Sequence, residues 1–288
     1  MRVVQGRVDR WTNGAGESFR RICWASPEVS DTLIVIHHGL GEHAGRYERY
    51  VAHLEPLGAH VWGYDARGHG ESDGPKGDAL GLAQLAGDLS AMVAALQLET
   101  GASKLVLIGH SMGAAVVGWL LTQGGPPEGL VGVVLSAPPL KVAMTPAIRV
   151  KLLAGRVLNK FVPGLRLANE LDSAHISSVP AEVERYLADP LVHDRLSVRL
   201  GLSIVRDGER VLRDAGRIGT PLLVVHGVDD GIATVEGARQ LIAGAGSADK
   251  RLIELPGLRH ETHHESPEQV EALLGTVRAW IAERVGQG

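Results

Sequence analysis

KLVLIGHSMG, at residues 104–113, is a strand-like apolar run that ends in the pattern G-x-S-x-G. The residues at 114–121 are small or apolar and suit a helix. A strand that turns sharply into a helix at this pattern holds its serine above the end of a sheet, with the hydroxyl exposed as a nucleophile. The stretch therefore predicts an α/β fold and makes Ser111 the candidate nucleophile.

A second match to the pattern occurs in GESDG, at residues 70–74. It lies in a glycine-rich segment, and Pro75 and Gly77 follow it, which is the composition of a loop. The context separates the two matches and identifies Ser72 as the decoy.

Short apolar runs alternate with helical patterns along most of the chain. Near-continuous apolar strands of this kind indicate a mostly parallel central sheet that is covered by helices on both faces. The N-terminal segment turns at residues 12–14 and is typical of an antiparallel hairpin at the sheet edge. The final helix is expected to begin at Ser266, because Gln269 completes a capping box. The strand runs are at residues 33–37, 60–64, 105–108, 131–135, 222–225 and 251–255, and the helices at 47–57, 82–98 and after Ser111.

The alternation breaks between residues 139 and 216, where helical pieces and loops occur without a convincing strand. Because the strand–helix pattern resumes afterwards, we expect a core at 1–138 and 217–288 and a helical cap inserted at 139–216. Ligands bind at the ends of the strands in such sheets, so the cap is expected to lie over the site.

Composition limits the class of protein further. The 288 residues are 44% hydrophobic and 22% charged, with a net charge of −4, which is typical of a globular protein and argues against a nucleic-acid partner. The single cysteine excludes an intrachain disulfide, and no secretory signal or membrane-spanning run is visible. We therefore expect a cytoplasmic protein. Nothing in the sequence indicates its oligomeric state.

A serine nucleophile needs a base and an acid that orients the base. After a G-x-S-x-G turn the chain order is serine, acid, histidine. The segment after residues 222–225 supplies Asp229 and Asp230, and the segment after residues 251–255 supplies His260. Asp229 competes with Asp230 for the role of acid, its alternative use being a hydrogen bond within the turn.

Thirteen histidines offer other candidates for the base. His110 adjoins the nucleophile, but neighbours across a tight turn point apart, so we expect it to pack beside the sheet. His263 and His264 lie nearer the final helix. The sequence therefore favours His260.

An oxyanion hole needs backbone N–H groups where negative charge develops, and one of them belongs to the residue after the nucleophile. That residue is Met112. The second donor comes from the loop after an early strand, where Leu40 lies between two glycines that let the backbone approach a substrate.

Several segments together resemble the monoacylglycerol lipases and their serine-hydrolase relatives in the α/β-hydrolase superfamily. The resemblance runs from about residue 30 to the C-terminus and implies Ser111, Asp230 and His260 as the triad, with Leu40 and Met112 as oxyanion donors. It is carried by HGLGEH with RY at 38–47, DARGHGES at 65–72, GHSMG at 109–113, DPLVH at 189–193, HGVDD at 226–230 and GLRHE at 257–261. Ala114 stands where the family usually has a second glycine.

The resemblance also implies that Glu42, Arg46 and His263 hold the glycerol hydroxyls. An ion pair that fastens a loop is an equal alternative for Glu42 and Arg46. No metal site is expected, because neither His37–His38 nor His263–His264 has partners at ligand spacing, and the chemistry needs no cofactor.

The segment at 146–162 predicts an apolar helix with one basic stripe formed by Arg149, Arg156 and Lys160. Two roles remain open for it: a cap helix packed on the core, or an interfacial helix in transient contact with membrane surfaces.

These observations predict a serine esterase that cleaves monoacylglycerol to glycerol and fatty acid through an acyl-enzyme. The alternatives are a lysophospholipase or general carboxylesterase of the same fold, and a non-catalytic small-molecule receptor.

Overall fold

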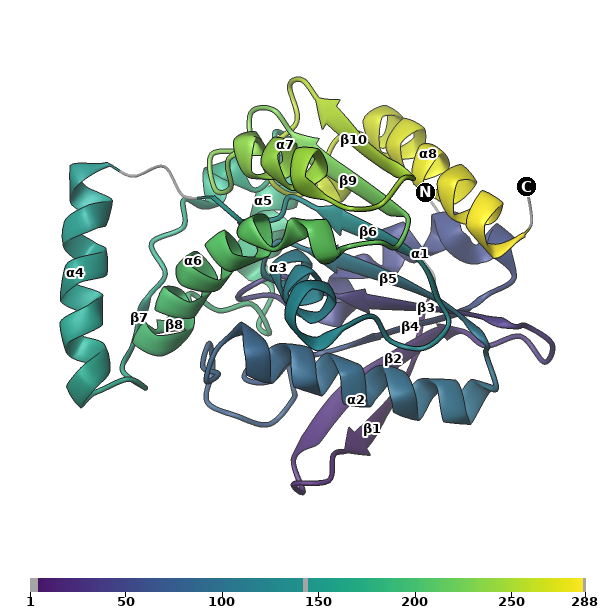
Figure 1. Ribbon diagram of the computed structural model, residues 1–288, viewed down its shortest axis with the longest axis horizontal. Coiled ribbons are helices and arrows are strands. Elements are labelled where there is room, and N and C mark those ends of the chain that lie inside the picture. Colours follow the sequence, from purple (N-terminus) through teal and green to yellow (C-terminus); the bar gives the residue numbers. More distant parts are fainter. Residues whose placement is uncertain (1–4, 142–144, 287–288) are drawn as a thin grey trace.

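Eight strands form one sheet within the residues that the computed structural model describes, 5–141 and 145–286 (Figure 1). Their order is β1-β2-β4-β3-β5-β6-β9-β10. The pairs β1–β2 and β2–β4 are antiparallel, and the other neighbours are parallel. The predicted mostly parallel sheet and N-terminal hairpin are thus confirmed. The strands are β1 (Arg7–Thr12), β2 (Ser18–Ala25), β3 (Thr32–His37), β4 (His60–Tyr64), β5 (Lys104–His110), β6 (Leu130–Ser136), β9 (Leu222–Gly227) and β10 (Lys250–Leu255).

Both faces of the sheet are buried at its central strands, which explains why β3, β5, β6 and β9 are almost continuously apolar. In β5, Leu105 and Leu107 join a core cluster on one face, and Val106 and Ile108 join a second cluster on the other. The first cluster lies under α2 (Leu82–Thr100), α3 (Met112–Trp119), α6 (Val198–Arg213) and α7 (Val235–Gly244). The second lies under α1 (Glu48–Leu54) and α8 (Pro267–Val285) (Figure 1).

The last helix begins as the sequence predicts. The Ser266 hydroxyl accepts a hydrogen bond from the backbone N–H of Gln269, and the Gln269 side chain accepts one from the backbone N–H of Ser266. This capping box satisfies two N–H groups that have no partner within the helix.

The strand order reverses at β3. The strand that follows it, β4, pairs on one side, and β5 pairs on the other. Loops that leave two such strands diverge and open a crevice at their carboxyl ends. The segment after β3 contains Leu40 and the segment after β5 contains Ser111, so the topology brings the two sequence candidates to one place.

Between β6 and β9 the chain forms α4 (Pro146–Phe161), β7 (Arg166–Ala168), α5 (Pro180–Ala188), β8 (Arg195–Ser197) and α6. The expectation that this stretch holds no strand is wrong, because β7 and β8 pair as a short antiparallel ribbon. Each of these strands has only three residues, and β7 is exposed throughout, so neither carries a recognisable apolar alternation. By contrast, α6 contributes fully buried Leu200 and Val211 to the core, so the end of the 139–216 stretch packs as a sheet-covering helix.

The helix α4 stands at the edge of the molecule (Figure 1). It has no buried residue and packs on α6, where Gly155 faces Leu202. Its outward face carries Val150, Leu153 and Phe161, whose exposed fractions are 67%, 63% and 79%. Within the described ranges, no helix combines the length and the apolar content needed to cross a bilayer.

The central strand offers a direct test of this packing. We expect Leu107→Ala to lower the free energy of unfolding by about 3 kcal/mol, because it opens a cavity between β5 and its covering helices. Leu98→Ala, at an 88% exposed position on α2, is the matched control and should change it by less than about 0.5 kcal/mol. Urea unfolding followed by circular dichroism measures both. Equal effects would contradict the assigned core.

Candidate active site

Ser111 sits in the turn between β5 and α3, in a strained backbone conformation with φ 51° and ψ −122°. Two glycines permit the turn. A Cβ at Gly113 would lie 2.2 Å from the carbonyl oxygen of His37, and one at Gly109 would lie 2.7 Å from that of Gly113. The turn is therefore pressed against the end of β3, which holds the serine hydroxyl beside the loop that follows β3.

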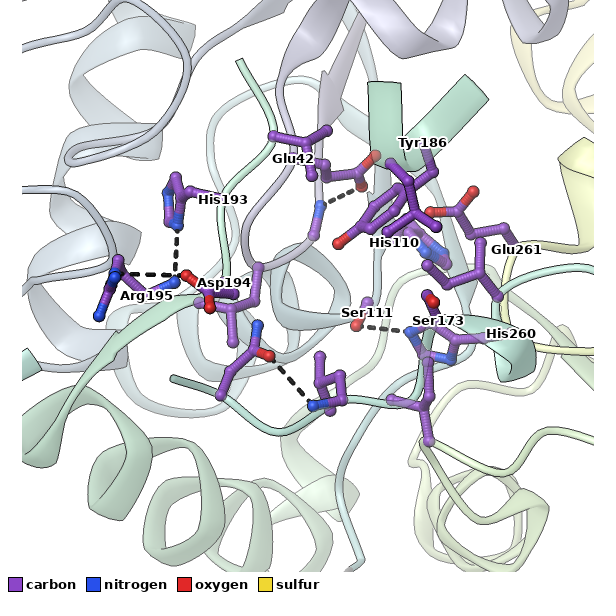
Figure 2. Close-up of a pocket in the computed structure, with 18 of the residues that line it drawn as sticks. Glu42, His110, Ser111, Ser173, Tyr186, His193, Asp194, Arg195, His260 and Glu261 are labelled. Carbon is purple, nitrogen blue, oxygen red and sulfur yellow. Dashed lines mark hydrogen bonds and ion pairs between the residues drawn. The ribbon is translucent and has the colours of Figure 1, made fainter. Parts of the chain in front are cut away.

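His260 connects Ser111 to Asp230. Its Nδ1 lies 2.7 Å from Asp230 Oδ2, and its Nε2 lies 2.8 Å from Ser111 Oγ (Figure 2). A carboxylate only accepts hydrogen bonds, so Nδ1 carries the hydrogen and Nε2 is left to accept the serine proton. The structure thus brings all three sequence candidates together in the order that a serine nucleophile requires.

The acid of this set is Asp230. Its Oδ1 accepts backbone hydrogen bonds from Ile232 (2.8 Å) and Ala233 (2.9 Å), and its side chain is fully buried. Burial raises its pKa, but the charge of His260 and the hydrogen bonds from His226, His260 and Ala233 outweigh this, so the pKa lies well below 3.8. Asp230 is therefore ionised at neutral pH.

The base is tuned by that carboxylate. Burial lowers the pKa of His260, but the adjacent Asp230 carboxylate outweighs it and raises the pKa above 6.5. His110 also contacts the base, with ring centroids 4.9 Å apart, and it lines the cavity. His110 is the buried last residue of β5 and its Nδ1 lies 3.3 Å from Ser136 Oγ at the end of β6, so it packs at the sheet as expected and does not act as the base, but the turn at Ser111 also leaves its ring on the cavity wall.

The two expected oxyanion donors belong to segments that meet at Ser111: Met112 follows it in the chain, and a Cβ at Gly39, the residue before Leu40, would lie 3.0 Å from Ser111 Cβ. Met112 is the first residue of α3, where backbone N–H groups have no acceptor within the helix. Leu40 lines the cavity in the loop after β3. The peptide between His38 and Gly39 is fixed, because the Gly39 N–H donates to Glu42 Oε1 at 2.6 Å.

A second contact fixes the same loop. His38 Nδ1 lies 2.7 Å from the Gly39 carbonyl oxygen, and His38 Nε2 accepts from the Ala66 N–H at 2.8 Å. Because Nδ1 faces an acceptor and Nε2 faces a donor, the neutral His38 ring carries its hydrogen on Nδ1.

The site also contains a buried network of charges. Arg46 donates to Glu42 Oε2 (2.7 Å) and forms a two-pronged contact with Glu261 (2.6 and 2.7 Å). Glu261 also lies 2.7 Å from His264 Nδ1. Burial works against the charge on Arg46, but the two carboxylates outweigh it and raise its pKa. Because Glu261 follows His260, this network joins the loop of the base to the oxyanion loop.

The three residues that the resemblance implied for glycerol binding occupy different places. Glu42 lies on the cavity wall, but Arg46 and His263 are not among the lining residues. His263 is 1% exposed, stacks on Tyr47 and has no hydrogen-bond partner for either ring nitrogen within the described part of the chain. Burial lowers the pKa of His263, so the ring is neutral.

A cavity of about 530 Å³ surrounds Ser111 (Figure 2). One part of its wall is polar and includes Glu42, Tyr186 and Glu261. Nothing in the sequence singles out Tyr186, because α5 lies in the stretch between β6 and β9, where no regular strand–helix alternation places its residues relative to the sheet. The apolar lining residues are Leu40, Leu171, Ile176, Leu187, Val192 and Ile232, and all but Leu40 and Ile232 come from the stretch between β6 and β9.

The other G-x-S-x-G serine has a different environment. The Ser72 hydroxyl donates to the Asp65 carbonyl oxygen at 2.6 Å and accepts from the Arg20 N–H at 2.8 Å. Both contacts fasten a loop to the sheet edge. Ser72 is therefore structural, as its sequence context predicts.

The polar side chains of the site do not form a metal centre. Among residues 5–141 and 145–286, no group of three or more His, Cys, Asp or Glu side chains is arranged to hold a metal ion.

A model of the family described as Serine aminopeptidase, S33, matches residues 28–267. The chain is 32% identical over 262 residues to the monoglyceride lipase of Homo sapiens, which covers 91% of this chain and 86% of the relative. It is 32% identical over 263 residues to the monoacylglycerol lipase of Mycolicibacterium smegmatis, which covers 91% and 92%. The crystal structure of the Paleococcus ferrophilus monoacylglycerol lipase superimposes with a TM-score of 0.82 at 33% identity, covering 94% of this chain and 99% of that one.

A serine-directed organophosphonate tests the reactivity of the site. We expect the reagent to label Ser111. The labelling rate should fall about tenfold for each pH unit below the pKa of His260, because only the neutral imidazole accepts the serine proton. Peptide mass spectrometry of samples quenched at several pH values measures this. Ser72→Ala is the control that retains labelling, and Ser111→Ala abolishes it. Labelling at Ser72, or a rate independent of pH between 5 and 8, would contradict the assignment.

Proposed function

The chain belongs to the serine-hydrolase family represented by that model and by the monoglyceride lipases, and on this basis we propose that it cleaves monoacylglycerol to glycerol and a fatty acid. It is a serine esterase with an α/β-hydrolase fold. The observation that carries the proposal is a single cavity wall on which Ser111 lies beside polar groups suited to a glycerol moiety.

The first half of the reaction forms an acyl-enzyme. Ser111 Oγ attacks the ester carbonyl carbon while His260 Nε2 takes the serine proton, and Asp230 orients and stabilises the resulting imidazolium. The negative charge on the former carbonyl oxygen is met by the N–H groups of Leu40 and Met112. The intermediate then collapses, the C–O bond to glycerol breaks, and His260 returns the proton to the leaving oxygen.

Water completes the reaction. His260 takes a proton from a water molecule, the hydroxide attacks the acyl carbon, and Ser111 leaves with the proton that His260 gives back. The products are a fatty acid and the original enzyme, and no cofactor is required.

Hydrogen-bond accounting supports glycerol recognition at Glu42. Its Oε1 already accepts from Gly39 N–H and from the Tyr47 hydroxyl (2.8 Å), and its Oε2 accepts from Arg46. A carboxylate oxygen accepts two hydrogen bonds, so Oε2 retains one site for a substrate hydroxyl. The hydroxyl of Tyr186 on the same wall supplies a second polar contact. We assign Arg46 and His263 a supporting place behind this wall.

The acyl chain then takes the apolar lining. The residues at 145–197 act as the cap of the site, because most of this lining comes from them. Several polar contacts tie the cap to the core, among them His43 Nε2 with Asp189 Oδ2 (2.9 Å) and Arg49 with Glu182 (2.6 Å).

Lys76 and Arg195 also line the cavity, but beside Glu42 and Glu261 the wall disfavours the phosphate of a lysophospholipid. Glu42 and Glu261 are buried carboxylates on the cavity wall, and one shared guanidinium, that of Arg46, stands between them. A phosphate placed there meets two negative groups, whereas a glycerol hydroxyl meets two acceptors.

A substrate panel tests the proposed function. We expect kcat/KM for a monoacylglycerol to exceed that for the diacylglycerol, and that for the methyl ester of the same acid, by at least about tenfold. The monoacylglycerol offers two free hydroxyls to Glu42 and Tyr186, whereas the diacylglycerol offers one and adds a second acyl chain, and the methyl ester offers none. Fatty-acid release measures the rates. Tyr186→Phe should lower kcat/KM for the monoacylglycerol about fivefold and leave the methyl ester unchanged, as expected for one lost hydrogen bond.

Two controls separate the parts of this test. Ser111→Ala should lower the rate of hydrolysis of every ester by at least about 10⁴-fold. Tyr50→Phe alters a buried tyrosine that does not line the cavity, so its substrate ratio should match that of the wild type. Equal rates on monoacylglycerol and methyl ester would contradict glycerol recognition. Activity that persists in Ser111→Ala would contradict the mechanism.

We also propose that α4 meets lipid surfaces. Val150, Leu153, Val157 and Phe161 follow helical spacing and form one exposed apolar face. The adjacent face carries the basic stripe of Arg149, Arg156 and Lys160, all exposed, which complements anionic headgroups. Leu171, which is both 41% exposed and part of the cavity lining, puts the cavity mouth in the segment that follows this helix.

Vesicle flotation tests this surface. The fraction of protein bound to phosphatidylcholine–phosphatidylglycerol vesicles should fall at least about fivefold in the Leu153→Ser, Phe161→Ser double variant. The two substitutions remove large apolar side chains from the exposed face that is proposed to enter the lipid surface. Leu98→Ser, at an exposed site on α2, is the control and should bind as the wild type does. Unchanged flotation of the double variant would overturn the proposal. A wild-type dimer in sedimentation that becomes a monomer in the double variant would also overturn it, because the apolar face would then be a dimer interface.

A further inference from the structure

His226 is a buried histidine that the reaction described above does not use. It lies near the end of β9, four residues before Asp230, and is 0% exposed. Its Nε2 lies 3.0 Å from the Ala233 carbonyl oxygen and 3.2 Å from Asp230 Oδ2. The second of these atoms is the same oxygen that receives His260 Nδ1.

The contacts determine where the hydrogen of this ring lies. Both neighbours of Nε2 are acceptors, so Nε2 carries the hydrogen and points it between the Ala233 carbonyl and Asp230. The other nitrogen, Nδ1, is buried with no hydrogen-bond partner in the described part of the chain. A hydrogen on Nδ1 as well would bury an unsatisfied donor, so the geometry favours the neutral ring with a single N–H.

With this contact the carboxylate of Asp230 is fully occupied. Its Oδ1 accepts from the N–H groups of Ile232 and Ala233, and its Oδ2 receives His260 and His226. Four donors match the four acceptor positions of a carboxylate. His226 therefore competes with His260 for one oxygen while it holds the acid's loop to β9 through Ala233.

We propose that His226 is a positioning residue for the acid: it fixes Asp230 Oδ2 against His260 and draws off part of the negative charge that this oxygen presents to the base. The inference rests on the proposed serine-hydrolase function. His226 touches neither Ser111 nor the cavity, so it acts only through Asp230.

The effect is a limit on the basicity of His260. Without the His226 donor, the whole of Oδ2 is available to the imidazolium, which becomes more stable. The titratable groups that face His260 are Asp230, His110, Glu261 and Glu42. His226 faces Asp230 and, across the strand pair, Glu254. Of these, only the contact between His226 and Asp230 changes in the variants below.

Two substitutions separate donation from packing. His226→Leu keeps a side chain of similar volume and removes the donor, whereas His226→Gln keeps an N–H at about the position of Nε2. Titration of His260 by NMR in histidine-labelled protein, assigned with His260→Ala, gives its midpoint without any substrate. The pH profile of kcat/KM on p-nitrophenyl butyrate gives the same midpoint from activity.

In His226→Leu we expect both midpoints to rise by about 0.5 pH unit, and kcat to fall about tenfold with KM little changed. His226→Gln should restore the wild-type midpoint and most of kcat. A midpoint that is unchanged or lowered in His226→Leu would overturn the inference and leave His226 as a loop clamp, and thermal unfolding would then show a lowered Tm as its only effect. Failure of the proposed function would give a different result, namely no ester hydrolysis by the wild type. The NMR titration needs no substrate, so it would still show whether His226 lowers the midpoint of His260.

Discussion

The site depends on the contact between the start of α3 and the end of β3. At Gly113 this contact is so close that no Cβ fits against the His37 carbonyl, and two residues earlier the chain turns through a positive φ at Ser111. Such a conformation costs free energy in a residue other than glycine, and the buried strands on either side hold it in place. The same contact sets the distance between the serine and the oxyanion loop. Fold and chemistry thus share one steric constraint.

Around that point, buried charges join loops that are far apart in sequence. Arg46 bridges Glu42, which holds the Gly39 N–H, and Glu261, which follows the base. Buried ions are costly unless each one is paired and hydrogen-bonded, so the arrangement tolerates little rearrangement. A shift of the loop that carries His260 would break the pairing that orients the oxyanion donor. The two halves of the site are therefore coupled mechanically, and the ion-pair role considered for Glu42 and Arg46 fits this geometry.

The sequence predicted the features that follow from burial and local turn chemistry. Strands covered on both faces must be apolar throughout, so the central runs could be recognised in the chain, and with them the order of Ser111, Asp230 and His260. The run at 251–255 lies in the edge strand β10 and carries the exposed charges of Arg251 and Glu254. The ribbon of β7 and β8 and the cavity position of Tyr186 could not, since these segments are short or exposed and their register is set by contacts with the core. The position of His110 depends on how the turn rotates its neighbours. His226 is a buried residue on a strand, and its contact with Asp230 exists only in three dimensions.

The loose attachment of α4 has a consequence for how this protein diversifies. Substitutions on its outer face are not expected to propagate to the sheet, because the helix has no buried residue and packs chiefly on α6. Substitutions on α4 can therefore change which surface the protein binds, while the positions of the reacting groups stay the same. The molecule thus separates into a core that holds the reacting groups and a peripheral helix, so the surface that the enzyme meets can change without a change in its chemistry.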